Sequence, residues 1–210
     1  MKSAWKLGVL LPMVVLALGA SGCDRLLRAS GIRSGDPPVD AESDAVVGQQ
    51  TLSNTEAGQL LENPEAGIQI TLPATWQEDD RLHPSAELQA SDATNQLYLI
   101  VVAEEDETLA RFGLPENSQR YRNLLANSLR SLDSQSATDV VFVGQDFASQ
   151  YEVRGQLDDG SPVVYLHTTV VSGPRYYQIV GWTTPEQYGF YKSELQGITE
   201  TFREITDDAQ

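Results

Sequence analysis

The most distinctive chemistry in this sequence belongs to the thiol of Cys23, the only cysteine among the 210 residues. It closes the run Ala20-Ser21-Gly22-Cys23, after an almost wholly apolar segment over residues 7–20 and two lysines, Lys2 and Lys6. A positively charged start, a short apolar core and small residues are the layout of an export signal. A single cysteine makes no disulfide within the chain, so the fold must depend on its apolar core.

The small residues before Cys23 resemble the lipobox of bacterial lipoproteins, in which the cysteine is acylated and becomes the first residue of the mature chain. Ala20 stands where that motif usually has leucine. We therefore predict a lipoprotein signal peptide over residues 1–22 and a lipid anchor, palmitate included, on Cys23. More than one acyl chain attaches a protein stably, whereas a single chain binds a membrane only marginally. The expected location is membrane-anchored and exported, on the periplasmic or thylakoid-lumen side.

Two other interpretations of the N-terminus stay open. The apolar run could be an uncleaved transmembrane anchor, although it has 14 residues and a span needs roughly 20. Ala20-Ser21-Gly22 is also acceptable to ordinary signal peptidase, which would leave Cys23 as a free N-terminal thiol.

The chain is strongly acidic, with a net charge of −16. Removing residues 1–22 takes away Lys2 and Lys6 and no acidic residue, so the net charge becomes −18. Nucleic-acid binding is excluded, because it needs a basic surface. Docking on anionic lipid by charge is disfavoured as well, so a lipid anchor would have to hold the protein there. The acidity serves either solubility or attraction to a basic partner surface.

Other residues capable of chemistry are few. G-x-S-x-G, G-x-G-x-x-G, the P-loop, H-E-x-x-H and C-x-x-C are all absent from the sequence. The two histidines are His83, before Pro84 in a predicted loop, and His167 in the middle of a predicted strand. A zinc site needs three or four ligands, and no spacing brings others to these two. We interpret them as loop-surface and sheet-packing residues, and predict no catalytic residue, metal site or cofactor.

The densest acidic run is Glu104-Glu105-Asp106-Glu107. Carboxylates suit hard cations such as calcium or manganese. The run lacks the alternating spacing and turn glycine of an EF-hand loop, which favours a solvated loop, with weak cation binding as the alternative.

Composition divides the rest of the chain into a tether, a domain and a tail. Residues 23–63 are polar and rich in small residues, which predicts a flexible tether, with a short helical turn possible over 55–61. We expect a single folded domain over residues 64–206 and an acidic tail over 207–210.

Within the domain, the periodicity of apolar residues predicts seven strands and two helices. The expected strands span 67–72, 85–91, 97–103, 140–147, 150–157, 163–171 and 175–183, and the expected helices 116–132 and 184–204. Thr184-Pro185-Glu186-Gln187 is typical of a helix start, with a capping residue before proline. Short connections predict antiparallel pairing. We expect an α+β fold, an antiparallel sheet with helices on both faces.

The segment from Gly67 to Trp76, a strand that runs into a proline and then a tryptophan, resembles the opening of the PsbP family. The aromatic strand from Tyr176 to Trp182, followed by a capped helix and Thr201-Phe202-Arg203, resembles its ending. The resemblance covers residues 64–205 and extends to DcrB-like lipoproteins. It implies an α-β-α sandwich without established catalysis, with Trp76 and Phe202 as core anchors.

PsbP itself is an extrinsic subunit on the lumenal side of photosystem II, and lipidated PsbP-like proteins occur in cyanobacteria. The resemblance therefore implies a non-catalytic accessory or assembly factor that binds a membrane protein complex, photosystem-related if the source is cyanobacterial. The alternative is a module that binds a small ligand or divalent metal through the acidic loop or the aromatic strand with Tyr176, Tyr177 and Trp182.

Overall fold

The structure is a computed structural model that describes residues 49–104 and 112–205. The predicted signal peptide, Cys23, the tail over 207–210 and Glu105 to Glu107 of the acidic run lie outside these ranges.

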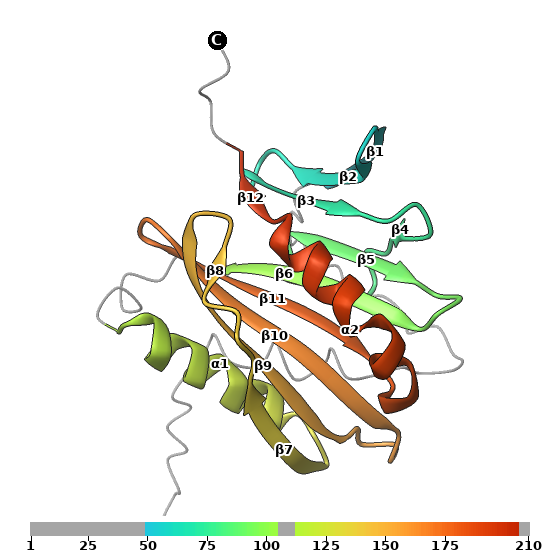
Figure 1. Cartoon of the computed structure of the whole chain (residues 1–210), viewed down its shortest axis with the longest axis vertical. Coiled ribbons are helices and arrows are strands. Elements are labelled where there is room, and N and C mark those ends of the chain that lie inside the picture. The colour runs from blue at the N-terminus through green and yellow to red at the C-terminus, as the bar shows by residue number, and fades with distance from the viewer. Residues whose placement is uncertain (1–48, 105–111, 206–210) are drawn as a thin grey trace, which may run out of the picture.

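An eight-stranded antiparallel sheet forms the body of the molecule (Figure 1). Its central strand β10 (Pro162–Ser172) pairs with β9 (Asp146–Gln156) on one side and β11 (Arg175–Thr183) on the other. Beyond β11 lie β6 (Leu97–Glu104), β5 (Leu88–Asp92) and β4 (Gln77–Glu78). Beyond β9 lies β7 (Ser131–Ala137), and the short β8 (Phe142–Val143) also pairs with β9. The predicted strands 97–103, 163–171 and 175–183 match β6, β10 and β11, which carry the most apolar stretches of the chain. The predicted strand 140–147 is wrong, because the chain turns at Gly144 between β8 and β9, and β9 runs on as one strand through the predicted strand 150–157.

A second sheet of four strands has the order β1-β2-β3-β12. It joins β1 (Thr51–Thr55), β2 (Gly58–Asn63) and β3 (Ile68–Leu72) to β12 (Arg203–Glu204). The first and last strands of the described chain are therefore the two outer strands of this sheet.

This second sheet corrects the predicted tether and helical turn. Residues 51–63 form the hairpin β1–β2, with β2 paired to β3 from Gln59 to Asn63. Leu61 of β2 is fully buried in the core. The polar composition hid this hairpin because the side chains of β1 are almost all exposed and its order comes from backbone pairing.

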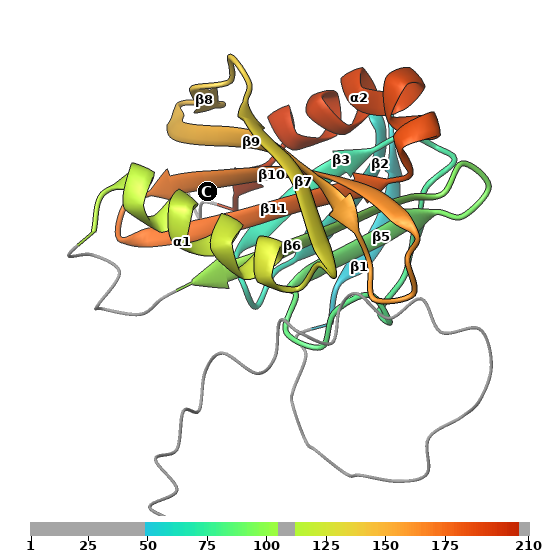
Figure 2. The same ribbon diagram turned by 90° about the horizontal axis from the view of Figure 1, so that it is seen from below.

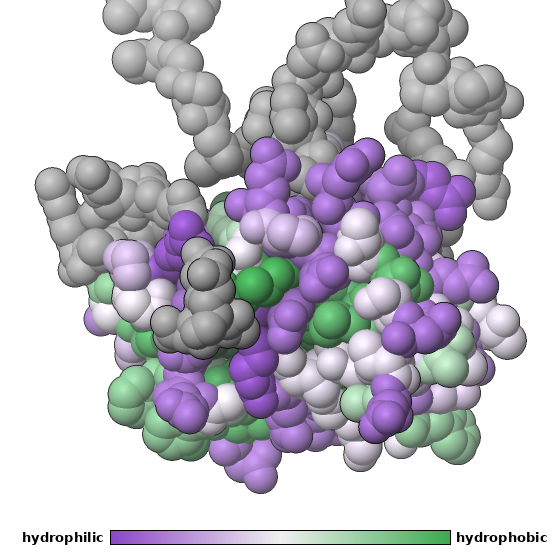
Figure 3. All heavy atoms as spheres, turned by 90° about the horizontal axis from the view of Figure 1, so that it is seen from above, coloured by the Kyte–Doolittle hydropathy of each residue, from purple (hydrophilic) through white to green (hydrophobic). Residues whose placement is uncertain are grey.

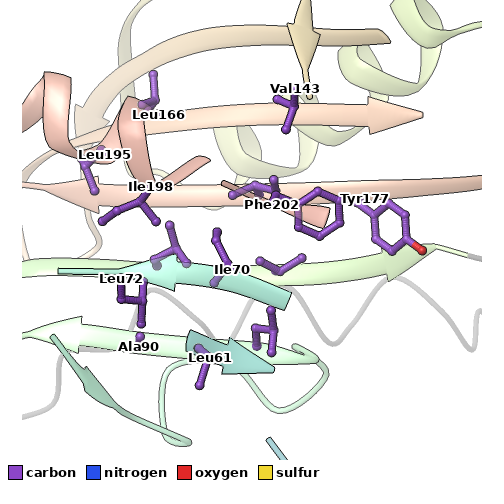
Figure 4. Packing of buried hydrophobic residues seen from close by; sticks show 14 of the residues in the cluster. Leu61, Ile70, Leu72, Ala90, Val143, Leu166, Tyr177, Leu195, Ile198 and Phe202 are labelled. Carbon is purple, nitrogen blue, oxygen red and sulfur yellow. The ribbon is translucent and has the colours of Figure 1, made fainter. Parts of the chain in front are cut away.

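The side chains of β10 alternate between two cores, as successive residues of a strand must. Val164, Leu166 and Val170 belong to the larger core, which holds the buried side of α2 (Pro185–Glu200) and of the four-stranded sheet (Figure 4). Val163 and Tyr165 belong to the smaller core, together with Tyr121 of α1 (Leu114–Asn127). Figure 2 shows α2 above and α1 below the strands β10 and β11.

The predicted fold class is therefore confirmed in part. The molecule is a curled antiparallel sheet with two helices, but it is mostly β-structure, and part of the layer beside α2 is itself a sheet. Neither helix of the described residues combines the length and hydropathy that crossing a membrane requires.

Helix boundaries match the sequence at the start of α2 better than elsewhere. The Thr184 side chain caps α2 by accepting a hydrogen bond from the backbone N–H of Gln187, as predicted. The helix ends at Glu200 because the following residues pair with β3 as β12. α1 ends at Asn127 instead of 132, since the chain from Ser131 adds to β9 as β7. Leu132, the last residue of the predicted helix, is 45% exposed on that strand.

The first prediction concerns Gly155 of β9, where the backbone of the α1–β7 connection approaches closely. A Cβ atom there would lie 2.3 Å from the Ser131 carbonyl oxygen and 2.7 Å from Leu129 Cδ1. Gly155→Ala should therefore lower the free energy of unfolding by about 1–3 kcal/mol, the range of overpacking strain. Urea unfolding measures it.

The matched control is Gly197→Ala on α2, where a Cβ atom meets nothing within 4 Å. It should raise the free energy of unfolding by up to about 1 kcal/mol, because alanine is the better helix former. Equal urea midpoints for the two variants would contradict the close approach at Gly155.

Candidate functional site

The largest group of interacting polar side chains on the α1 face of the sheet surrounds His167. His167 and Thr169 of β10 and Gln178 of β11 are all fully buried. They share a face because Thr169 lies opposite Gln178 in the strand register and His167 is two residues earlier. His167 Nε2 lies 2.8 Å from Gln178 Oε1, and Thr169 Oγ1 donates to the same oxygen over 2.7 Å.

Helix α1 covers this group on the side away from the sheet. The Tyr121 ring stacks on the His167 ring with centroids 5.0 Å apart and planes 13° from parallel. Glu104, at the end of β6, accepts a hydrogen bond from Gln178 Nε2 over 2.7 Å and pairs with Arg120 Nη2 at 2.5 Å. We call His167, Thr169, Gln178, Glu104, Arg120 and Tyr121 the His167 cluster. Its contacts run from the centre of the sheet to the helix and fasten α1 to it.

Burial sets the charge of His167. Loss of solvent lowers the pKa of His167 to about 4, and the nearby positive charge of Arg122 acts in the same direction, while the hydrogen bond with Gln178 opposes them. The ring is therefore neutral at pH 7. Because Gln178 Oε1 can only accept, Nε2 carries the proton and Nδ1 does not. Nδ1 has no hydrogen-bond partner among the described residues, so a proton added there would be buried without an acceptor.

This geometry assigns the cluster a role in holding the structure together. A general acid or base must come within hydrogen-bond reach of its substrate, and His167 is fully buried in this conformation. The interpretation of His167 as a sheet-packing residue is confirmed. His83 lies in the expected loop but is buried, with Nδ1 accepting from the Ser85 N–H over 3.1 Å, so its expected surface position is wrong.

The predicted acidic run is represented by Glu104 alone. Its carboxylate is already engaged by Arg120 and Gln178. Whether Glu105 to Glu107 bind a cation falls outside the described residues. Within residues 49–104 and 112–205, no group of three or more His, Cys, Asp or Glu side chains is placed to hold a metal ion.

The aromatic strand does not form one ligand site, because its residues point to opposite faces. Tyr177 faces the larger core, where its ring packs on Phe202 and its hydroxyl donates to Glu204. Tyr176 points to the α1 face and donates to the Phe112 carbonyl over 2.9 Å. Trp182 lies further along that face and stacks on Tyr98 with centroids 5.4 Å apart. A ligand site that uses Tyr176, Tyr177 and Trp182 together is therefore excluded.

The two predicted core anchors are confirmed. Trp76 and Phe202 are both buried in the larger core. The indole N–H of Trp76 donates to Glu194 on α2 over 2.9 Å, which ties the loop after β3 to the helix.

The β8–β9 hairpin presents exposed apolar side chains that the sequence analysis did not single out. Val141, Phe142 and Phe147 are 59%, 49% and 62% exposed, and the two phenyl rings lie 5.0 Å apart. Elsewhere large exposed apolar side chains are more scattered, such as Phe190 on α2 at 83% exposure. On the face seen in Figure 3, hydrophobic residues form small patches among hydrophilic ones. The only sequence signal was two phenylalanines flanking Gly144 in a predicted strand.

The second prediction concerns the pH dependence of stability. The pKa of His167 is about 4 in the folded chain against an ordinary value of 6.5. The unfolded chain therefore binds more protons between these values, and stability present above pH 6.5 is lost as pH falls towards 4. The contribution of His167 to this loss reaches about 3 kcal/mol below pH 4.

Urea unfolding of the wild type and His167→Gln between pH 7 and pH 4 isolates this contribution, because glutamine does not titrate and all other groups are common to both. The variant should lose less stability on acidification than the wild type. Parallel pH profiles would show that His167 is not held neutral.

Comparisons with known proteins identify similar folds among solved structures. No protein-family model matches the sequence, and no curated protein matches it. The solution structure of cyanobacterial PsbP (CyanoP) from Synechocystis sp. PCC 6803 is similar with a TM-score of 0.50 and 14% sequence identity, covering 80% of this chain and 99% of that one. A crystal structure from Bacteroides thetaiotaomicron VPI-5482 is similar with a TM-score of 0.50 and 12% identity, covering 72% of this chain and 50% of that one.

LpqN of Mycobacterium tuberculosis, described as involved in cell envelope biogenesis, is a more distant match, with a TM-score of 0.43 and 15% identity over 73% of this chain and 89% of that one. At such identities, structural similarity establishes a fold and nothing finer. The chain has a PsbP-like fold, as the resemblance of the segments around β3 and from β11 to Arg203 predicted.

Proposed function

We propose that this protein is an exported lipoprotein, anchored through Cys23 on the periplasmic or thylakoid-lumenal face of a membrane. It acts there as a non-catalytic accessory or assembly protein for a membrane protein complex. The observation that carries the proposal is the position of the only cysteine, directly after a charged start, an apolar run and small residues.

The fold supports the second half of the proposal. The similar CyanoP structure is a cyanobacterial PsbP, and a cyanobacterial source would make a photosystem the partner complex. The net charge of −18 for the mature chain favours a partner with a basic exposed surface.

The interior is consistent with binding through the outer surface. His167 is the described side chain best suited to acid–base chemistry. It is fully buried, and its Nε2–H donates a hydrogen bond to Gln178. Glu104 and Arg120 neutralise each other beside it. These groups hold α1 in place, which leaves recognition to exposed residues.

The third prediction compares the wild type with Cys23→Ser in the native host. The wild type should incorporate a clickable palmitate analogue and sediment with membranes, whereas Cys23→Ser should do neither, because serine lacks the thiol that is acylated. After gentle crosslinking, the wild type should recover a defined membrane complex that mass spectrometry identifies, and the variant should recover much less of it.

The two parts of this experiment separate the anchor from the partner. Equal membrane sedimentation of both forms would refute acylation at Cys23. Acylated protein that is recovered without any membrane protein would refute the accessory role and leave the anchor intact.

A further inference from the structure

The β8–β9 hairpin is a rigid support for its exposed apolar side chains. Phe142 pairs with Phe147 across the two strands, and Val143 pairs with Asp146 around the turn. The Ala148 N–H donates to the Val141 carbonyl over 2.9 Å. These backbone bonds set the direction of both phenyl rings.

Alternation along the hairpin separates its buried and exposed sides. Val143 and Ala148 are buried in the larger core, each next to an exposed phenylalanine in the sequence. Gly144 has a φ of +62°, a conformation open to glycine, and the Arg203 side chain lies so close that a Cβ at Gly144 would be 2.9 Å from Nη1. The turn of the hairpin thus lies against Arg203 and one side of its strands lies against the core, while the rings stay outside.

The exposed apolar group is much smaller than an ordinary protein interface, so by itself it would cover only a small part of one. A stable interface covers about 800 Å² on each partner, some 20–30 residues, whereas only Val141, Phe142 and Phe147 gather here. Asp139, Gln145 and Asp146 lie within a few positions of them in the sequence. A few exposed aromatic and aliphatic side chains on a hairpin, bordered by polar residues, suit shallow insertion into the interface of a lipid bilayer.

The length of the chain before the described residues brings such a bilayer within reach. The 25 residues from Asp24 to Gly48 span at most about 90 Å. A chain of that length held at Cys23 keeps the domain near the membrane, so even a weak contact is formed at high effective concentration. This step rests on the anchor proposed above.

We propose that Val141, Phe142 and Phe147 insert into the bilayer leaflet to which Cys23 is attached. This second contact with the membrane orients the tethered domain. Since the chain is strongly acidic, the fitting surface is one of zwitterionic or neutral lipid. The lipid anchor supplies the attachment and the hairpin supplies the orientation.

The fourth prediction uses tryptophan as a depth probe. Chain purified from membranes is reconstituted in phosphatidylcholine vesicles, with or without bromine on the acyl chains. Phe142→Trp and Phe147→Trp are measured separately, and the wild-type fluorescence is subtracted from each. The fluorescence of the introduced tryptophan should shift to shorter wavelength on vesicles, and most of it should be quenched by brominated lipid. Both positions are exposed, so the fold should be unchanged, which the urea midpoint checks.

The matched control is Phe190→Trp, whose site is more exposed than either hairpin position but lies on α2. Its emission should be unaffected by bromine. Unquenched Phe142→Trp and Phe147→Trp on vesicle-bound protein would overturn the proposal, as would hairpin quenching no greater than that of Phe190→Trp. A photocrosslinker at position 142 that captures a protein and no lipid in native membranes would assign the hairpin to a protein partner and also overturn it.

Flotation of the vesicles separates this proposal from the anchor. Protein that floats without hairpin quenching refutes membrane insertion alone. If the native protein does not float, the acylated anchor is refuted, and the free thiol of Cys23 is then coupled to a maleimide lipid in the same vesicles. Quenching read on that coupled protein supports or overturns insertion by the same criteria.

Discussion

The pairing of β10 with its two neighbours is the constraint on which the rest of the structure depends. β10 is bonded along nearly its whole length to β9 and β11 and is buried from Val163 to Val170. Since its alternate side chains supply the two cores, a one-residue shift in register would exchange the residues that face α1 with those that face α2. Both helices, and the polar group between α1 and the sheet, are placed by this one register.

The two faces of the sheet are covered in different ways. On the α2 face, the larger core of mainly aliphatic residues is closed by the C-terminal residues: Glu204 accepts from Tyr177 and Ser172, and the Ile205 N–H donates to the Gly67 carbonyl. On the α1 face, the helix packs on the smaller core and is also held by the His167 cluster. Polar contacts of this kind are directional, so they define one position for the helix but need every partner in place.

These two faces bear on function because the side chains capable of acid–base chemistry, such as His167, point into the interior. Among the described residues, the exposed apolar side chains gather most closely on the β8–β9 hairpin, in a chain that is strongly acidic. A protein that is anchored by lipid does not need a large interface of its own to stay at the membrane. In the proposed function, the anchor provides location, the hairpin provides orientation and the acidic surface is left free for a partner.

Residues that act through local patterns were readable in the sequence. The alternation of β3, the apolar stretches of β10 and β11, the Thr184 cap and the layout before Cys23 each depend on neighbours in the chain. The tertiary structure decided whatever depends on distant partners. It made residues 51–63 a hairpin through pairing with β3, ended α1 before Ser131 through pairing with β9, and stacked His167 on Tyr121, 46 positions away. Hydrogen bonds between distant strands leave no periodic trace in polar segments, and burial of a histidine depends on what the fold places above it.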